Sequence, residues 1–67
     1  MKTQRIKERM EEKHITVGRM AQELGMDPST YYRKMQKNGE DFSALDLIVF
    51  KRVLELDEKS ALDFLLS

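Results

Sequence analysis

The segment Gly25-Met26-Asp27-Pro28 constrains the fold most, because it ends one helix and starts another within four residues. Glycine adopts the left-handed conformation that closes a helix at little cost, so Gly25 predicts a helix end. Asp27 is a favoured N-cap, and Pro28 fits the first helical position, where its missing N–H costs nothing. The segment therefore predicts two short helices joined by a tight turn.

The flanking residues give each of these helices one apolar face. Thr16 is expected to cap the first helix, whose apolar residues recur at helical spacing: Val17, Met20, Ala21 and Leu24. The second helix is expected to run from Pro28 to about Lys37, and only Tyr31 and Met35 point inward on it. Its outer face, with Tyr32 exposed, is polar or amphipathic and is left without a role in the core.

Three further helices are expected around this pair. A charged helix over 2–13 carries Ile6 and Met10 on one face. A helix over 42–56 begins with a capping box of Ser43 and Asp46, and Asp57 caps a short last helix. The helix over 42–56 is predicted to be apolar on two sides and central to the fold, with one stripe of Leu45, Ile48, Val49, Val53 and Leu56 and a second of Leu47, Phe50 and Leu54. The predicted class is all-α, with five short helices in one domain over 1–67.

Length and residue types exclude several functions. A chain of 67 residues has room for one core. It has no Cys and one His, so it has no disulfide, no nucleophilic thiolate and no His cluster for zinc. No apolar run approaches the ~20 residues of a membrane-spanning helix. We expect a cytoplasmic protein that is not an enzyme, with no cofactor, no small-molecule substrate and no membrane partner.

Charge is balanced overall but unequal between the two halves. The chain has 12 basic and 12 acidic residues. Residues 1–38 contain nine basic and five acidic side chains, a net charge of +4, whereas residues 39–67 have a net charge of −4. Such a split is a hint of a polyanionic partner for the basic half, although an imbalance of four charges also arises by chance.

Residues 17–36, VGRMAQELGMDPSTYYRKMQ, resemble the helix-turn-helix of the phage repressor and Cro family. That pattern has a small fifth residue, Gly at the ninth position and apolar residues at the fourth, eighth, tenth and fifteenth. Six residues match it: Met20, Ala21, Leu24, Gly25, Met26 and Tyr31. The resemblance implies a lambda-repressor-like domain with a helix-turn-helix core over about 16–37. The sequence departs from the pattern at the first position, Val17, and at Lys34.

The resemblance implies a site on double-stranded DNA. The helix over 28–37 would enter the major groove. Its candidates for reading bases are Ser29, Thr30, Tyr32, Arg33 and Gln36. The candidates for holding phosphate are Thr16, Gln22, Lys34, Lys37 and Asn38.

Two functions remain open. The first is a sequence-specific transcriptional regulator, repressor- or Cro-like, of phage or prophage origin and homodimeric. The second is a protein-interaction module on the same scaffold, such as an antirepressor that binds another regulator. The terminal residues Phe64, Leu65 and Leu66 either complete the core or form half of a dimer interface.

Overall fold

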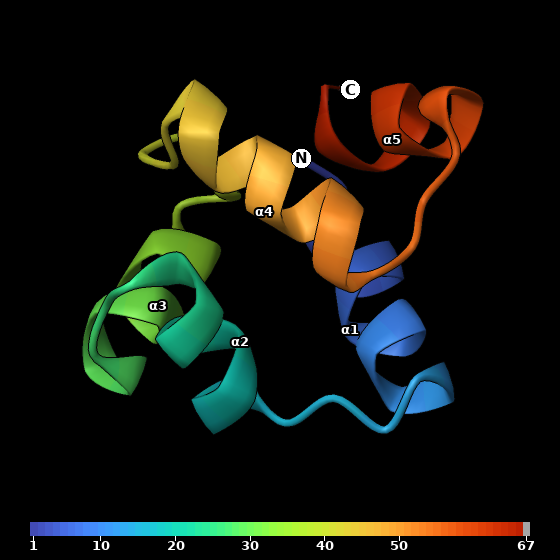
Figure 1. The fold of residues 1–67 in the computed structure, drawn as a ribbon. Helices are drawn as coiled ribbons and strands as arrows, with labels where there is room; N and C mark the ends of the chain where they lie inside the picture. Colours follow the sequence, from blue (N-terminus) through green and yellow to red (C-terminus); the bar gives the residue numbers. More distant parts are fainter. Residues whose placement is uncertain (67) are drawn as a thin grey trace.

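The computed structural model describes residues 1–66; Ser67, the last residue of the predicted domain, lies outside the described residues. Five helices follow one another: α1 Thr3–Glu12, α2 Val17–Leu24, α3 Pro28–Gln36, α4 Ala44–Val53 and α5 Glu58–Leu65 (Figure 1). No strand occurs within 1–66. The all-α class with five short helices is confirmed.

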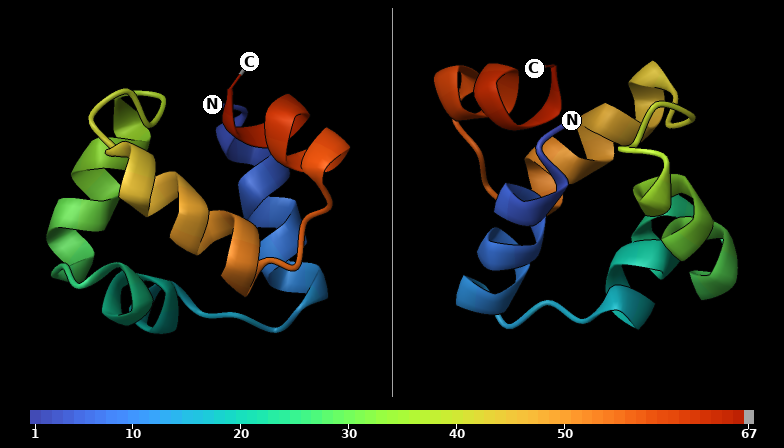
Figure 2. Two further views of the ribbon diagram at one scale, coloured as in Figure 1. Left: turned by 45° about the horizontal axis from the view of Figure 1, so that its top comes forward. Right: turned by 180° about the vertical axis from the view of Figure 1, so that it is seen from behind.

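Helix α4 lies between two pairs of helices. Figures 1 and 2 show α2 and α3 on one side of it and α1 with α5 on the other. A turn at residues 13–14 and the non-helical residues 15–16 carry the chain from one pair to the other. Phe50 of α4 and Leu54, the residue directly after this helix, are fully buried, as are Ile6 of α1 and Met20 of α2. One hydrophobic core therefore joins both pairs through α4.

Each predicted N-cap is confirmed. The Thr16 hydroxyl accepts from the Arg19 N–H at 3.1 Å, and the Asp57 carboxylate accepts from the Ser60 N–H at 2.7 Å. The Ser43 hydroxyl and the Asp46 carboxylate each accept from the other residue's N–H, which is the capping box expected for α4. These contacts are local, so the sequence pattern was sufficient to predict them.

The helix ends share one backbone motif. Gly25 closes α2 with φ of 70°: its N–H donates to the Gln22 carbonyl, and the Met26 N–H donates to the Ala21 carbonyl. The same pair of hydrogen bonds ends α1 and α4, although His14 (φ 56°) and Glu55 (φ 52°) stand in the left-handed position. At three junctions this residue is followed by an apolar residue and then by an N-cap: His14-Ile15-Thr16, Gly25-Met26-Asp27 and Glu55-Leu56-Asp57. The apolar residue packs on the core, which stabilises the turn.

The prediction for α4 is wrong at its end and on one face. The left-handed Glu55 stops the helix, so α4 ends at Val53 and Leu56 is buried in the following turn. Leu45 and Ile48 are 74% and 60% exposed. The reason is that the helix pairs cover α4 on two sides only, and the sequence pattern alone could not show that the rest of its apolar surface stays open.

Candidate nucleic-acid interface

Helix α3 has one anchored face and one open face. Tyr31 and Met35 are buried, which confirms their predicted core role. At 100° per residue, Ser29, Arg33 and Gln36 fall on the opposite, outward side, and all three are exposed. Tyr32 lies on one flank of that side and is 55% exposed, as predicted.

The anchoring of α3 is largely aromatic. The Tyr31 ring lies 6.2 Å from that of Phe42 and 6.3 Å from that of Phe50 of α4, between ring centroids. Its hydroxyl donates to the Met10 sulfur of α1 at 3.4 Å. Burial raises the pKa of Tyr31 to about 12, because the charged phenolate is poorly solvated there. Side chains from two other helices thus hold α3 in place, so that its outer face is presented on a rigid element.

Two of the predicted α3 residues lie away from the open face. Thr30 and Lys34 are half-buried. They fall on the flank of α3 opposite Tyr32, and the Lys34 ammonium lies 5.7 Å from the centroid of the Phe42 ring. A cation over an aromatic face is attracted by the ring. The structure therefore groups Ser29, Tyr32, Arg33 and Gln36, and sets Thr30 and Lys34 to one side.

The cap at the N-terminus of α3 limits the hydrogen bonds that the Ser29 side chain can make to another molecule. The Asp27 carboxylate accepts from the Ser29 N–H at 2.9 Å and also from the Ser29 hydroxyl. These hydrogen bonds lower the pKa of Asp27, the one from the hydroxyl most. Since its proton is engaged, the Ser29 hydroxyl is left with acceptor capacity only.

The predicted phosphate-binding residues around α3 differ in their exposure and in the contacts that they already make. The Thr16 hydroxyl caps α2 by accepting from the Arg19 N–H, and it keeps its own proton for a further partner. Gln22 is exposed on the outer face of α2. Lys37 pairs with Asp41 at 3.4 Å, and Asn38 stands in the left-handed turn after α3 with φ of 58°. Lys37 and Asn38 therefore already have structural roles at the end of α3.

Ion pairs between the two halves of the chain offset part of the charge split. Lys2 pairs with Asp63 at 2.6 Å, and Lys13 with Glu55 at 2.7 Å. These two contacts lower the pKa of both carboxylates. In α1, Arg9 donates to the Leu54 carbonyl at the end of α4 at 3.0 Å.

Several cations of the described residues lie outside these ion pairs, among them Lys7 of α1, Lys51 of α4 and Lys59 of α5. Within residues 1–66, no carboxylate lies within ion-pair distance of Arg19, Arg33 or Lys34. By contrast, Arg52 of α4 pairs with Glu23 of α2 at 3.0 Å. Arg19, Arg33 and Lys34 therefore keep their positive charge available on α2 and α3, as Lys7 does on α1.

Sequence reasoning missed that α1 borders the open face. A groove of about 370 Å³ lies between α1, the start of α2 and α3. Tyr32 and Gln36 line it from α3, and Lys7 and Glu11 line it from α1. No sequence signal reveals this proximity, because α1 and α3 are brought together only by the shared core.

Other kinds of site are not formed by the described residues. No three His, Cys, Asp or Glu side chains within 1–66 gather closely enough to hold a metal ion. In the same range, every helix is too short or too polar to cross a membrane. No family model, curated protein or solved structure matches the chain.

Proposed function

We propose that this protein is a sequence-specific DNA-binding transcriptional regulator that inserts α3 into the major groove. The single observation that carries the proposal is the outward face of α3, which groups Ser29, Tyr32, Arg33 and Gln36 on a helix anchored by buried Tyr31 and Met35. The resemblance of residues 17–36 to the phage repressor and Cro helix-turn-helix points the same way. Regulation would follow from occupancy, since a protein bound at an operator blocks polymerase.

The side chains of this face differ in what they can read. Arg33 can donate to both major-groove acceptors of guanine, which is worth about 1–3 kcal/mol of discrimination. The Ser29 oxygen can only accept, so it suits the exocyclic amine of adenine or cytosine. Gln36 fits adenine, and the Tyr32 ring can contact a thymine methyl. The face therefore favours a mixed recognition sequence with one guanine opposite Arg33.

Phosphate contacts would come from the borders of the face. Thr16 and the exposed Gly18 lie at the N-terminus of α2, where helix N–H groups favour an anion. Arg19 and Lys34 supply positive charge without a competing carboxylate. Lys37 would have to leave Asp41, an exposed pair of small energetic cost. With so few cations, one copy would bind DNA weakly, which favours a dimer.

The second candidate, a protein-interaction module such as an antirepressor, is favoured by a different observation. Four of the five most exposed large apolar side chains lie on α4 and at α5: Leu45, Ile48, Leu62 and Leu66. Apolar surface of this kind is typical of protein contacts. It is compatible with DNA binding by α3, because the two surfaces involve different helices.

The test is selection of the purified protein against random duplex DNA at low, stated salt. The variant Arg33→Ala removes the guanine donor, and Lys59→Ala is a matched control that removes an exposed cation from α5. We expect an enriched motif, loss of preference at one base pair in Arg33→Ala, and no change in Lys59→Ala.

Each other outcome has a defined meaning. Equal loss of affinity on every sequence would make Arg33 a phosphate contact. Absence of enrichment, in a protein that circular dichroism shows to be helical, would refute DNA recognition and favour the protein-interaction module.

A further inference from the structure

The groove between α1 and α3 combines an apolar floor with a polar rim. Its volume of about 370 Å³ lies near the lower end of the range of small-molecule sites. The floor is formed by side chains that the core already buries: Met10, Ile15, Tyr31 and Met35. The size and the floor of this groove therefore suit one small, largely apolar molecule.

The floor favours an aromatic ring over an aliphatic group. The sulfur atoms of Met10 and Met35 can each contact a ring, and contacts between sulfur and aromatic rings are favourable. The rings of Tyr31 and Tyr32 also line the groove, 6.0 Å apart between centroids and inclined by 69°. Aromatic rings attract one another in edge-to-face and offset arrangements. An aromatic ligand therefore gains contacts here that an aliphatic ligand of the same size would lack.

The α1 side of the rim presents two opposite charges. Lys7 and Glu11 are both exposed and lie one turn apart on the same face of α1. Among the described residues, no carboxylate lies within ion-pair distance of the Lys7 ammonium, and no cation lies within that distance of the Glu11 carboxylate. Lys before Glu is the weaker order for such a pair on a helix. Both charges are therefore available to a ligand in the groove.

We propose that the α1–α3 groove binds a small aromatic zwitterion, namely an aromatic amino acid. Its ring lies on the floor, its carboxylate at Lys7 and its ammonium group at Glu11. A purely anionic ligand at Lys7 would meet the like charge of Glu11, and a purely cationic ligand at Glu11 would meet Lys7. A ligand that carries both signs is complementary to both side chains. Across the groove, the Gln36 amide and the Tyr32 hydroxyl can hydrogen-bond the same polar groups.

The ligand site shares two side chains with the outward face of α3. Tyr32 and Gln36 line the groove and also belong to the proposed DNA-reading surface. An occupied groove would compete with DNA for both residues, a consequence that rests on the proposed function. Ligand binding itself does not rest on it, so a titration without DNA tests the site alone.

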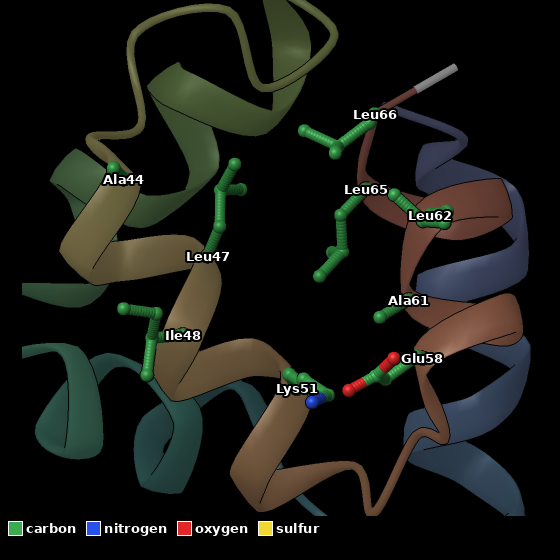
Figure 3. A pocket seen from close by; sticks show the side chains of 9 residues that line it. All are labelled: Ala44, Leu47, Ile48, Lys51, Glu58, Ala61, Leu62, Leu65 and Leu66. Atoms are coloured by element: carbon green, nitrogen blue, oxygen red, sulfur yellow. The ribbon is translucent and has the colours of Figure 1, made fainter.

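The groove between α4 and α5 provides a comparison within the same molecule. Its volume is similar, about 380 Å³, and Lys51 and Glu58 point toward one another at one end of it (Figure 3). Its remaining lining residues are aliphatic, Leu47, Ile48 and Leu65 among them, and include no ring or sulfur atom. The two grooves thus carry the same pair of charged residue types and differ in their floors, so the α4–α5 groove should not select an aromatic ligand.

Titration of the ¹⁵N-labelled full chain, followed by amide chemical shifts, tests the proposal with three probes. L-phenylalanine carries both charges, 3-phenylpropionate lacks the ammonium group and 2-phenylethylamine lacks the carboxylate. At the binding efficiency usual for ligands of this size, L-phenylalanine should bind with a Kd of about 1 mM or below. Each of the other probes lacks one exposed ion pair and should bind about twofold to fivefold more weakly. The largest shifts should fall on residues of the groove, such as Lys7, Glu11 and Gln36.

Two variants assign the two charges of the ligand. Lys7→Gln should weaken L-phenylalanine by about twofold to fivefold and should not weaken 2-phenylethylamine, which has no carboxylate. Glu11→Gln should weaken L-phenylalanine similarly and should not weaken 3-phenylpropionate, which has no ammonium group. Lys51→Gln is the matched control, because it removes the corresponding cation from the α4–α5 groove and should leave all three affinities unchanged. Circular dichroism of each variant checks its fold.

Three results would overturn the proposal. Absence of a saturable shift up to about 20 mM L-phenylalanine would exclude the site. Shifts that centre on Leu47 and Ile48 would place the ligand in the α4–α5 groove. Equal affinity for the three probes, or unchanged binding of L-phenylalanine by both Lys7→Gln and Glu11→Gln, would show that the charges of the rim do not select the ligand.

Discussion

Replacement of Ala21 by leucine is the sharpest test of how α2 is packed. Ala21 is completely buried, and its helix contacts both α3 and α4. Its carbonyl also accepts from the Met26 N–H at 3.0 Å in the turn between α2 and α3. Leucine would add three carbons to a side chain that is already completely buried where helices and turn meet.

The expected loss of stability follows from this overpacking. Extra methylene groups in a packed core cost about 1–3 kcal/mol. For a domain of this length each kcal/mol lowers the melting temperature by about 4–8 °C, so the expected fall is about 4–24 °C. A chain of 67 residues has a total unfolding free energy of roughly 3–10 kcal/mol, so the change removes a large share of it.

Thermal unfolding followed by circular dichroism at 222 nm measures the effect. The matched control is Gln22→Leu, which introduces the same side chain at the next position of α2, where the residue is exposed. We expect the control to change stability by no more than about 0.5 kcal/mol.

Two results would refute the reasoning. A melting temperature of Ala21→Leu within about 2 °C of the unmodified protein would mean that no close approach exists at this position. An equal fall in both variants would show that leucine disturbs α2 itself, whatever its neighbours.

Two further predictions concern the turn at His14 and the ring of Tyr31. A left-handed backbone costs about 1–2 kcal/mol for residues other than glycine. Because His14 adopts this conformation, His14→Gly should raise the melting temperature by about 4 °C or more. A fall in the melting temperature would mean that the His14 side chain stabilises the turn. Because the pKa of Tyr31 is raised from 10.0 to about 12, the unfolded chain loses this proton first, so stability should fall as pH rises from about 10 to 12. In the folded protein, absorbance at 295 nm should show a tyrosine ionising near pH 12 that Tyr31→Phe removes; an unchanged titration would contradict the burial of this hydroxyl.

The local features of the fold could be predicted because they depend on residues a few positions apart. Caps such as Thr16 and Ser43, and the helix end at Gly25, act through one turn of backbone and were confirmed. The inward residues of α3, Tyr31 and Met35, followed from helical spacing in the same way. The exposure of Ser29, Tyr32, Arg33 and Gln36 also followed, whereas Thr30 is half-buried on a flank of the helix. The role of these residues in reading DNA stays a prediction.

Predictions from the sequence failed where residue type alone determines neither the backbone conformation nor the neighbours that bury a side chain. His14 and Glu55 adopt left-handed φ without being glycine. The buried side chains of Ile15 and Leu56 that follow them offset the cost. For that reason α4 stops earlier than its apolar pattern indicated. Burial of an apolar residue depends on what lies beside it, so Leu45 could not be placed from spacing alone.

By itself the sequence determined five helices, their caps and the polar outer face of α3, because these depend on contacts within one or two turns. The tertiary structure alone decided the rest. In the folded chain α1 lies beside α3, Lys2 and Lys13 form ion pairs with the acidic half, and the α4–α5 face stays open. Each of these depends on residues distant in the chain, and their proximity is set by how the helices share one core.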